Sequence, residues 1–248
     1  MELASIIERL SKAYGPRGWW PLPSRAGLDG RDEGGYRDAS SEPIGPDSPG
    51  PDRELRRRAR FEIAAGAVLA QNTAWRGASK ATAALAARGL LSPAALLRAE
   101  ASELEALLRP AGTYARKALY LKTLAAAWPA LDSGVPSRAE LLTLRGVGYE
   151  TADCILCYCY GEPRFVADAY ARRIAARCGA APTGLGYEAL RIYAEATLAH
   201  DAAYLAEAHA LLVEHAKRRC RAKPQCPGCA LEGACPTALA RPRGHDGA

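Results

Sequence analysis

The 248-residue sequence has no long uninterrupted run of apolar residues and no hydrophobic core near its start of the kind that directs secretion. A helix that crosses a bilayer needs about 20 mostly apolar residues, so no membrane partner is expected. The first residues mix acidic and basic side chains among the aliphatic ones, unlike a signal peptide. These absences predict a cytoplasmic protein, and a net charge of +6 is compatible with a polyanionic partner.

Valine, isoleucine, phenylalanine and threonine are scarce in residues 53–219, where alanine and leucine dominate. The scarce residues are those that favour strands, so we expect an all-α fold. Helix-capping patterns support this prediction. They are Ser92 before Pro93, Ser102 with Glu105, and Ser137 with Glu140. The predicted helices after the first cover residues 61–70, 76–88, 92–98, 102–108, 113–127, 137–143, 149–160, 168–177, 187–198 and 201–219.

Composition divides the chain into four parts. Residues 1–22 contain an amphipathic helix that ends in an aromatic cluster, and we expect this part to pack on the C-terminal lobe. Residues 23–52 are rich in Gly, Pro, Ser and Asp, which predicts a linker or a long exposed loop. Residues 53–162 are expected to form a helical bundle, and residues 163–248 a C-terminal helical lobe.

Eight cysteines are present, and their spacing separates them into two groups. Cys220, Cys226, Cys229 and Cys235 lie close together near the C-terminal end, which suits a [4Fe–4S] cluster or a zinc ion. A zinc ribbon more often has two C-x2-C pairs, and only one is present here. The remaining four are expected in the apolar core, as small hydrophobic side chains. These are Cys154, Cys157, Cys159 and Cys178.

The segment from Leu144 to Gly148, with the sequence LRGVG, forms a tight turn between two predicted helices. Its glycines let the backbone adopt positive φ and approach a ligand closely. Together with the start of the next helix, the turn concentrates N–H groups that can bind a phosphate oxygen. An ordinary packing corner between helices has the same pattern, and short glycine motifs also match by chance.

The order of these motifs resembles the helix-hairpin-helix DNA glycosylase superfamily, the endonuclease III group in particular. In that group an LPGVG hairpin is followed by an aspartate at the start of a later helix, and Asp168 matches that position. The segment AGAVLAQNT resembles the glutamine-bearing helix end of the same family. The resemblance implies a two-lobed fold with the motif at residues 137–160, and a monomer that binds damaged double-stranded DNA at the nucleoid. It assigns DNA contacts to Gln71, Asn72, Leu144, Arg145, Gly146, Val147 and Gly148.

The same resemblance favours a [4Fe–4S] cluster over zinc, held in a loop over residues 220–235. The first gap between the cysteines is one residue shorter than in the family, so the shape of the loop is expected to differ. Basic side chains surround the first ligand, as suits a loop that faces phosphates. They are Lys217, Arg218, Arg219, Arg221 and Lys223.

Endonuclease III enzymes that also cleave the strand carry a lysine in the second hairpin helix, and that position holds Glu150. A carboxylate cannot form the imine that this cleavage requires, and no lysine occurs in residues 123–216. The sequence is similar to a narrower branch, the endonuclease III-like 3-methyladenine DNA glycosylases, which implies absent or weak lyase activity. Alkylated purines are cationic and leave readily, so Asp168 is expected to stabilise the sugar cation and orient water.

A flipped-out, electron-poor base is expected to stack on aromatic side chains. Trp19, Trp20 and Trp75 are candidates for this lesion pocket, with core packing as the alternative. Glu150 and Lys217 are further candidates, although Lys217 also suits a phosphate contact. Two other functions stay open: a glycosylase with lyase activity on oxidised pyrimidines, and a non-catalytic DNA-binding iron–sulfur protein.

Overall fold

The structure is a computed structural model, and it describes residues 1–17, 20–24 and 53–240. Within these ranges the regular secondary structure is helical and no strand occurs. The all-α prediction is therefore confirmed. None of the helices in the described part of the chain is long and apolar enough to cross a membrane.

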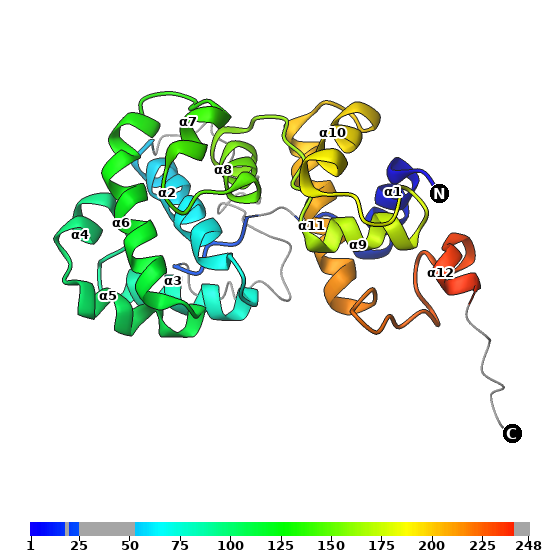
Figure 1. Cartoon of the computed structure of the whole chain (residues 1–248), viewed down its shortest axis with the longest axis horizontal. Helices are drawn as coiled ribbons and strands as arrows, with labels where there is room; N and C mark the ends of the chain where they lie inside the picture. The colour runs from blue at the N-terminus through cyan, green and yellow to red at the C-terminus, as the bar shows by residue number, and fades with distance from the viewer. Residues whose placement is uncertain (18–19, 25–52, 241–248) are drawn as a thin grey trace, which may run out of the picture. The chain divides into compact units, whose positions relative to one another are not determined.

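Two compact units make up the fold (Figure 1). Unit 1 combines residues 1–17 with the chain from Phe165 onward, and unit 2 comprises Gly18–Arg164. Unit 1 contains α1 (Leu3–Tyr14), α9 (Ala169–Arg177), α10 (Tyr187–Thr197), α11 (Ala202–Arg218), a 3-10 turn (Glu232–Ala234) and α12 (Pro236–Leu239). Unit 2 contains α2 (Arg53–Ala70), α3 (Trp75–Ala87), α4 (Pro93–Arg98), α5 (Ala101–Leu108), a 3-10 turn (Arg109–Ala111), α6 (Tyr114–Leu131), α7 (Arg138–Thr143) and α8 (Tyr149–Tyr160).

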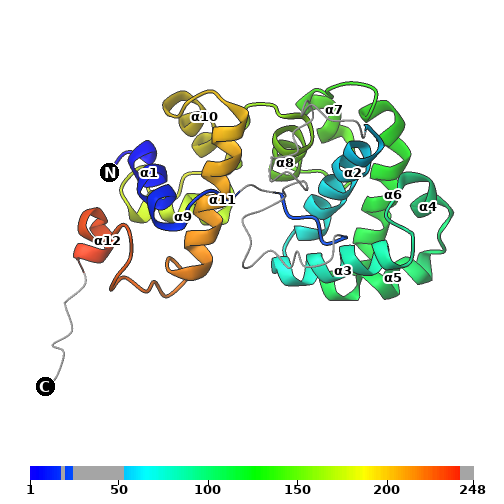
Figure 2. The same ribbon diagram turned by 180° about the vertical axis from the view of Figure 1, so that it is seen from behind.

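Helix α2 runs through the middle of unit 2, where it packs against α3, α6 and α8 (Figure 1, Figure 2). Phe61 of α2 is fully buried and meets Trp128 of α6 edge-on, with 5.0 Å between ring centroids. Cysteines of α8 face the same interior. Trp128 is buried as well, and the core positions predicted for Cys154, Cys157 and Cys159 are confirmed.

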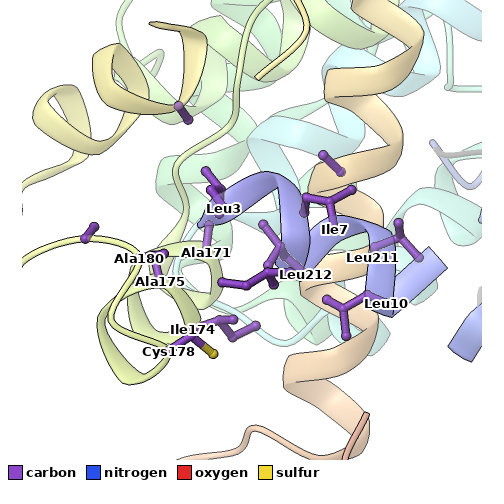
Figure 3. Close-up of a cluster of buried hydrophobic side chains, with 14 of the residues drawn as sticks. Leu3, Ile7, Leu10, Ala171, Ile174, Ala175, Cys178, Ala180, Leu211 and Leu212 are labelled. Carbon is purple, nitrogen blue, oxygen red and sulfur yellow. The ribbon is translucent and has the colours of Figure 1, made fainter. Parts of the chain in front are cut away.

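The core of unit 1 is built from segments at both ends of the chain (Figure 3). Leu3, Ile7 and Leu10 project from one face of α1 toward α9 and α11, where they meet apolar side chains such as Ile174 and Leu212. Because these residues are three or four positions apart, they lie on one face of the helix, and α1 buries apolar area at that face only. Helix α1 thereby closes a core that residues after Phe165 cannot complete alone.

The first helix ends at Tyr14 because of the two residues that follow it. Gly15 adopts a φ of 67°, and its N–H bonds back to the carbonyl of Ser11. Pro16 cannot continue the helix, since it lacks an N–H group. Trp20 and Leu22, further along, are buried in unit 2 rather than in unit 1.

Two of the three predicted caps are confirmed. Ser92 accepts a hydrogen bond from the N–H of Ala95, and Ser137 forms a complete capping box with Glu140. The capping box predicted at Ser102 is wrong, because α5 has already begun at Ala101. The N–H of Leu104 bonds to the carbonyl of Glu100, so Ser102 lies within the first helical turn.

Candidate functional site

The predicted hairpin is present between α7 and α8. Gly146 has a φ of 95°, in the region that favours glycine. A Cβ at this position would overlap the ring of Tyr120, which lies directly against the turn. The glycine is therefore required by both backbone conformation and space.

The hairpin backbone reaches the surface where α8 begins. Val147 is only 8% exposed and anchors the turn, whereas Arg145, Gly148, Tyr149 and Glu150 are exposed. The residue before α8 is Gly148, which has no side chain that could cap the helix. The exposed helix start presents backbone N–H groups and the positive end of the helix dipole, which suits an anion such as phosphate.

An ion pair that the sequence did not reveal fixes the two hairpin helices to each other. Arg138 of α7 donates from Nε to Oδ1 of Asp153 at 2.8 Å and from Nη2 to Oδ2 at 3.0 Å. Asp153 in α8 is fully buried. The guanidinium of Arg138 also lies over the ring of Tyr149, 4.9 Å from its centroid. Such two-point contacts set the geometry of both helices at once.

Gln71, at the end of α2, is tied to the hairpin. Its Nε2 donates to the carbonyl of Gly146 at 2.7 Å and to Oγ1 of Thr151 at 2.9 Å. The neighbouring Asn72 is exposed and has a φ of 50°, which turns the chain sharply after the helix. The structure therefore brings Gln71 and the hairpin together, although they are far apart in sequence.

A second polar group near the end of α2 is the buried Lys117 of α6. Its Nζ donates to the carbonyls of Leu69 and Ala111 at 2.8 and 2.7 Å. Burial lowers the pKa of this lysine from its ordinary value. The ammonium group satisfies one carbonyl at the end of α2 and one in the 3-10 turn, and so supports the segment that carries Gln71.

Aromatic side chains gather beside the start of α3. Trp20 and Trp75 meet edge-on with 5.3 Å between ring centroids, and Trp20 also lies 5.2 Å from Tyr158. Trp20 is 6% exposed, while Trp75 is partly exposed. A Cβ at Gly66 would lie 3.1 Å from Nε1 of Trp20, so the ring packs close to the α2 backbone. The third candidate, Trp19, lies outside the described residues.

Asp168 occupies the position just before α9, in unit 1. Its Oδ1 accepts a hydrogen bond from the N–H of Ala171 at 2.7 Å, so the carboxylate caps the helix. The residue is 8% exposed. Nε2 of His209, in α11, lies 3.6 Å from the other oxygen, Oδ2. Asp168 is thus held at a helix start, where a negative charge is favoured.

Lys217 lies on the same helix as His209 but eight residues later, about 12 Å further along the helix axis. It is partly buried, and its carbonyl accepts a hydrogen bond from Nε of Arg221 at 2.8 Å. The α11 side chain beside Asp168 is therefore His209. Glu150, the other charged pocket candidate, belongs to unit 2.

The four C-terminal cysteines line a single pocket of unit 1. Cys220, Cys226, Cys229 and Cys235 all contribute to its wall, together with His215. Burial raises the pKa of the Cys229 thiol, and the neighbouring thiols of the set raise it further. Among the described residues, no three Cys, His, Asp or Glu side chains converge closely enough to form a metal-ion group as they stand.

Side chains of α9 and α11 hold this cysteine loop in place. Arg177 donates from Nη1 to the carbonyl of Arg221 at 2.6 Å and from Nη2 to that of Ala222 at 2.8 Å. Nε2 of His215 lies 3.6 Å from Sγ of Cys229. Burial lowers the pKa of His215 to about 4, so the ring is neutral near pH 7. The neutral ring of His215 and the loop carbonyls bound by Arg177 therefore surround the cysteines and hold them in place, as the groups around a metal site do.

Cys178 is buried, which confirms the core position predicted for it. Its Sγ nevertheless lies 3.8 Å from Sγ of Cys235, so it borders the cysteine pocket. Burial is the main cause that raises the pKa of the Cys178 thiol, and neighbouring Cys235 adds to it. We assign Cys178 to the wall behind the pocket.

Known proteins resemble this chain in both sequence and fold. The family model for the HhH-GPD superfamily base excision DNA repair protein matches residues 65–198. A Methanocaldococcus jannaschii protein, provisionally named a DNA repair glycosylase, is 36% identical over 188 residues, covering 71% of this chain and 85% of the relative.

Two solved structures have a similar fold. Endonuclease III in a non-covalent DNA complex has a TM-score of 0.69 at 20% identity, covering 96% of this chain and 97% of that chain. The H. pylori 3-methyladenine DNA glycosylase bound to 1,N6-ethenoadenine has a TM-score of 0.63 at 21% identity, covering 88% and 98%. The predicted family resemblance is thereby confirmed. The chain belongs to the HhH-GPD superfamily of base excision DNA repair proteins, and within it is a DNA glycosylase.

Proposed function

We propose that the chain is a monofunctional DNA glycosylase that removes alkylated purines of the 3-methyladenine or 7-methylguanine type. The observation that carries this proposal is Glu150, exposed in the first turn of α8. It stands where the resemblance to endonuclease III puts the lysine of strand-cleaving enzymes. A carboxylate at this position cannot attack the sugar to form an imine, but it favours a positively charged base.

Asp168 is the proposed catalytic residue. Its carboxylate is nearly buried and held by the backbone of α9, so the charged group does not have to move or reorient during the reaction. In the proposed reaction the bond from the sugar to the base breaks, and its electron pair neutralises the cationic purine. The oxygen of a water molecule then bonds to the anomeric carbon and releases a proton to the solvent, with Asp168 stabilising the positive charge on the sugar until the bond forms.

The lesion pocket is proposed to use the aromatic group of unit 2. Trp75 is more exposed than Trp20, which supports a stacking role for Trp75, and Trp20 packs edge-on against its ring. Trp19, Glu150 and Lys217 are further proposed residues for lesion recognition. An electron-poor purine between aromatic faces gains both apolar burial and stacking.

Double-stranded DNA is the proposed partner of a monomeric protein at the nucleoid of the cytoplasm. The exposed hairpin from Leu144 to Gly148 supports a contact with the phosphate backbone. Gln71 and Asn72 are proposed to contact the duplex beside the flipped nucleotide. Unit 1 adds a cavity of about 380 Å³ whose wall includes Arg172, Arg173 and Arg177, in agreement with a polyanionic partner.

The four cysteines of the C-terminal pocket are proposed ligands of a [4Fe–4S] cluster. Four thiols line one pocket, and they fit such a cluster in donor type and number. The neutral imidazole of His215 and loop carbonyls bound by Arg177 surround them. When bound, the cluster would cross-link the loop and so keep its basic residues in one conformation. Ligation of the thiolates by the cluster would offset the burial and the mutual repulsion that raise the pKa of Cys229.

The test is base release from a panel of duplexes that contain alkylated, oxidised or deaminated bases, assayed with the full-length protein. We expect release of methylated purines, loss of that release in Asp168→Asn, and retained DNA binding in the variant. Asparagine still caps helices well, so the substitution preserves the start of α9. Borohydride treatment on abasic DNA is expected to trap little or no covalent adduct.

Two outcomes overturn the proposal. Release of oxidised pyrimidines with efficient borohydride trapping would assign the lyase function of endonuclease III instead. An inactive wild-type protein across the whole panel, with intact binding to DNA, would support the non-catalytic alternative.

A further inference from the structure

The two oxygens of the Asp168 carboxylate have different neighbours. Oδ1 is held by the N–H of Ala171 at 2.7 Å, which is the ordinary bond of a helix cap. Oδ2 lies 3.6 Å from Nε2 of His209, on another helix of the same unit. The side chains of Asp168 and His209 are only 12% and 5% exposed, so little water competes for this contact.

His209 is a polar residue on an apolar face of α11. Leu205 and Leu212, one helical turn away on either side, are fully buried in the core of unit 1. An imidazole among aliphatic side chains costs free energy unless it has polar partners. The carboxylate of Asp168 is such a partner, because α9 and α11 pack against each other.

We propose that His209 is a positioning residue for the catalytic step, holding the Asp168 carboxylate in the orientation that faces the sugar; this inference rests on the proposed function. The cap alone fixes one oxygen and leaves the carboxylate plane to turn about its last bond, a torsion with a broad minimum. A hydrogen-bond donor at Oδ2 fixes the second oxygen, and therefore the plane of the Asp168 carboxylate.

The separation of 3.6 Å between Nε2 and Oδ2 is longer than a hydrogen bond. Catalytic hydrogen bonds are often long before substrate binds and shorten in the complex. In the proposed complex, the N–H of Nε2 donates a hydrogen bond to Oδ2, and the remaining lone pairs of the carboxylate stay directed toward the anomeric carbon and the attacking water. His209 does not touch the substrate.

The test compares His209→Leu with His209→Gln, in the full-length protein and on duplex DNA that contains a methylated purine. Leucine has a similar volume but no donor, whereas the glutamine amide can reach the position of Nε2. We expect His209→Leu to lower the single-turnover rate by about tenfold to a hundredfold while the Kd for DNA is unchanged. His209→Gln is expected to recover most of the rate.

A double-mutant cycle separates positioning from mere packing. In the Asp168→Asn background there is no carboxylate to orient, so adding His209→Leu should change the residual rate by less than about twofold. A packing role would instead make the two losses multiply, and would make glutamine as harmful as leucine. Unfolding temperatures of all variants are measured alongside, and His209→Met replaces the leucine variant if the latter does not fold.

The inference and the proposed function fail in different ways. If Asp168→Asn abolishes release but His209→Leu or His209→Met works at the wild-type rate, only the role of His209 is overturned. If glutamine gives no recovery over leucine, the role is likewise overturned. If Asp168→Asn itself releases base at the wild-type rate, the catalytic assignment falls, whatever the His209 variants do.

Discussion

Arg138 and Asp153 form a two-point ion pair across the hairpin, with N–O distances of 2.8 and 3.0 Å. Asp153 is fully buried, so Arg138→Leu would leave a carboxylate without its guanidinium in the interior. Loss of one partner of a buried pair costs about 3–5 kcal/mol in the free energy of unfolding. Urea denaturation followed by circular dichroism measures this loss.

The matched control for that variant is Arg88→Leu. Its pair with Glu103 is exposed, and such pairs contribute about 0–1 kcal/mol. Equal destabilisation by the two substitutions would contradict the role assigned to the buried pair.

Ser137 links the stability of the hairpin to pH. Hydrogen bonds from the backbone and side chain of Ser137 lower the pKa of Glu140 below its ordinary value of 4.5. A carboxyl group whose pKa is lowered by folding adds stability above its unfolded pKa, and this is lost as the pH falls through the folded value. In Ser137→Ala the pKa of Glu140 should rise toward 4.5, which an NMR titration of the side-chain carboxyl detects.

Ser92→Ala provides the comparison for this titration. Ser92 caps α4 through its hydroxyl, but the third helical residue there is Ala95 and not an acid. Both variants lose a cap, worth about 0.5–2 kcal/mol in comparable proteins. Only Ser137→Ala should change how the free energy of unfolding falls at acidic pH. An unchanged titration of Glu140 in that variant would contradict the role assigned to Ser137.

Glu150→Lys should introduce strand-cleavage chemistry into the proposed glycosylase. A lysine at this exposed position of α8 supplies the amine that an imine with the abasic sugar requires. Borohydride trapping on abasic DNA should increase by about tenfold over the wild type. Glu105→Lys makes the same change of charge in α5 and should not increase trapping. Equal trapping by both variants would show that the added charge alone is responsible.

Cys226→Ser should remove the proposed cluster, whereas Cys157→Ser should not. Cys226 belongs to the set that lines the C-terminal pocket, while Cys157 is buried in unit 2. The wild type is expected to be brown and to contain about four iron atoms per chain. Visible absorbance and metal analysis of the three proteins provide the measurement. Stoichiometric zinc in a colourless wild-type protein would overturn the cluster but not the role of Asp168.

The helices were predictable because local composition determines them. The hairpin turn, the caps at Ser92 and Ser137, and the aspartate before α9 all depend on residues within a few positions of one another. Where a helix depends on distant partners, its limits were not predictable. Helix α2 begins at Arg53, before the predicted start at residue 61. Arg57 and Arg60, in its early turns, pair with Asp132 beyond the end of α6.

Features of the fold and the site that depend on contacts between distant residues were likewise not predictable from the sequence. Helix α6 continues past Pro129 to Leu131, where burial of Trp128 and Leu131 compensates for the missing N–H group. His209 and Asp153 were not identified as important, since the partner of each is brought close only by the packing of two helices. A histidine or aspartate inside an apolar helix face is the signal that could have indicated such partners.

Unit 1 is assembled from the first 17 residues and the stretch that begins at Phe165, with all of unit 2 lying between them in sequence. During synthesis on the ribosome, α1 emerges first and has no apolar face to join until α9 and α11 follow. Chains begin to fold from the N-terminal end during synthesis. The helices of unit 2 contact partners nearer in sequence than those of α1, so unit 2 can fold before the partners of α1 have been synthesised. Asp168, at the start of α9, therefore meets His209 only after α11 has been synthesised.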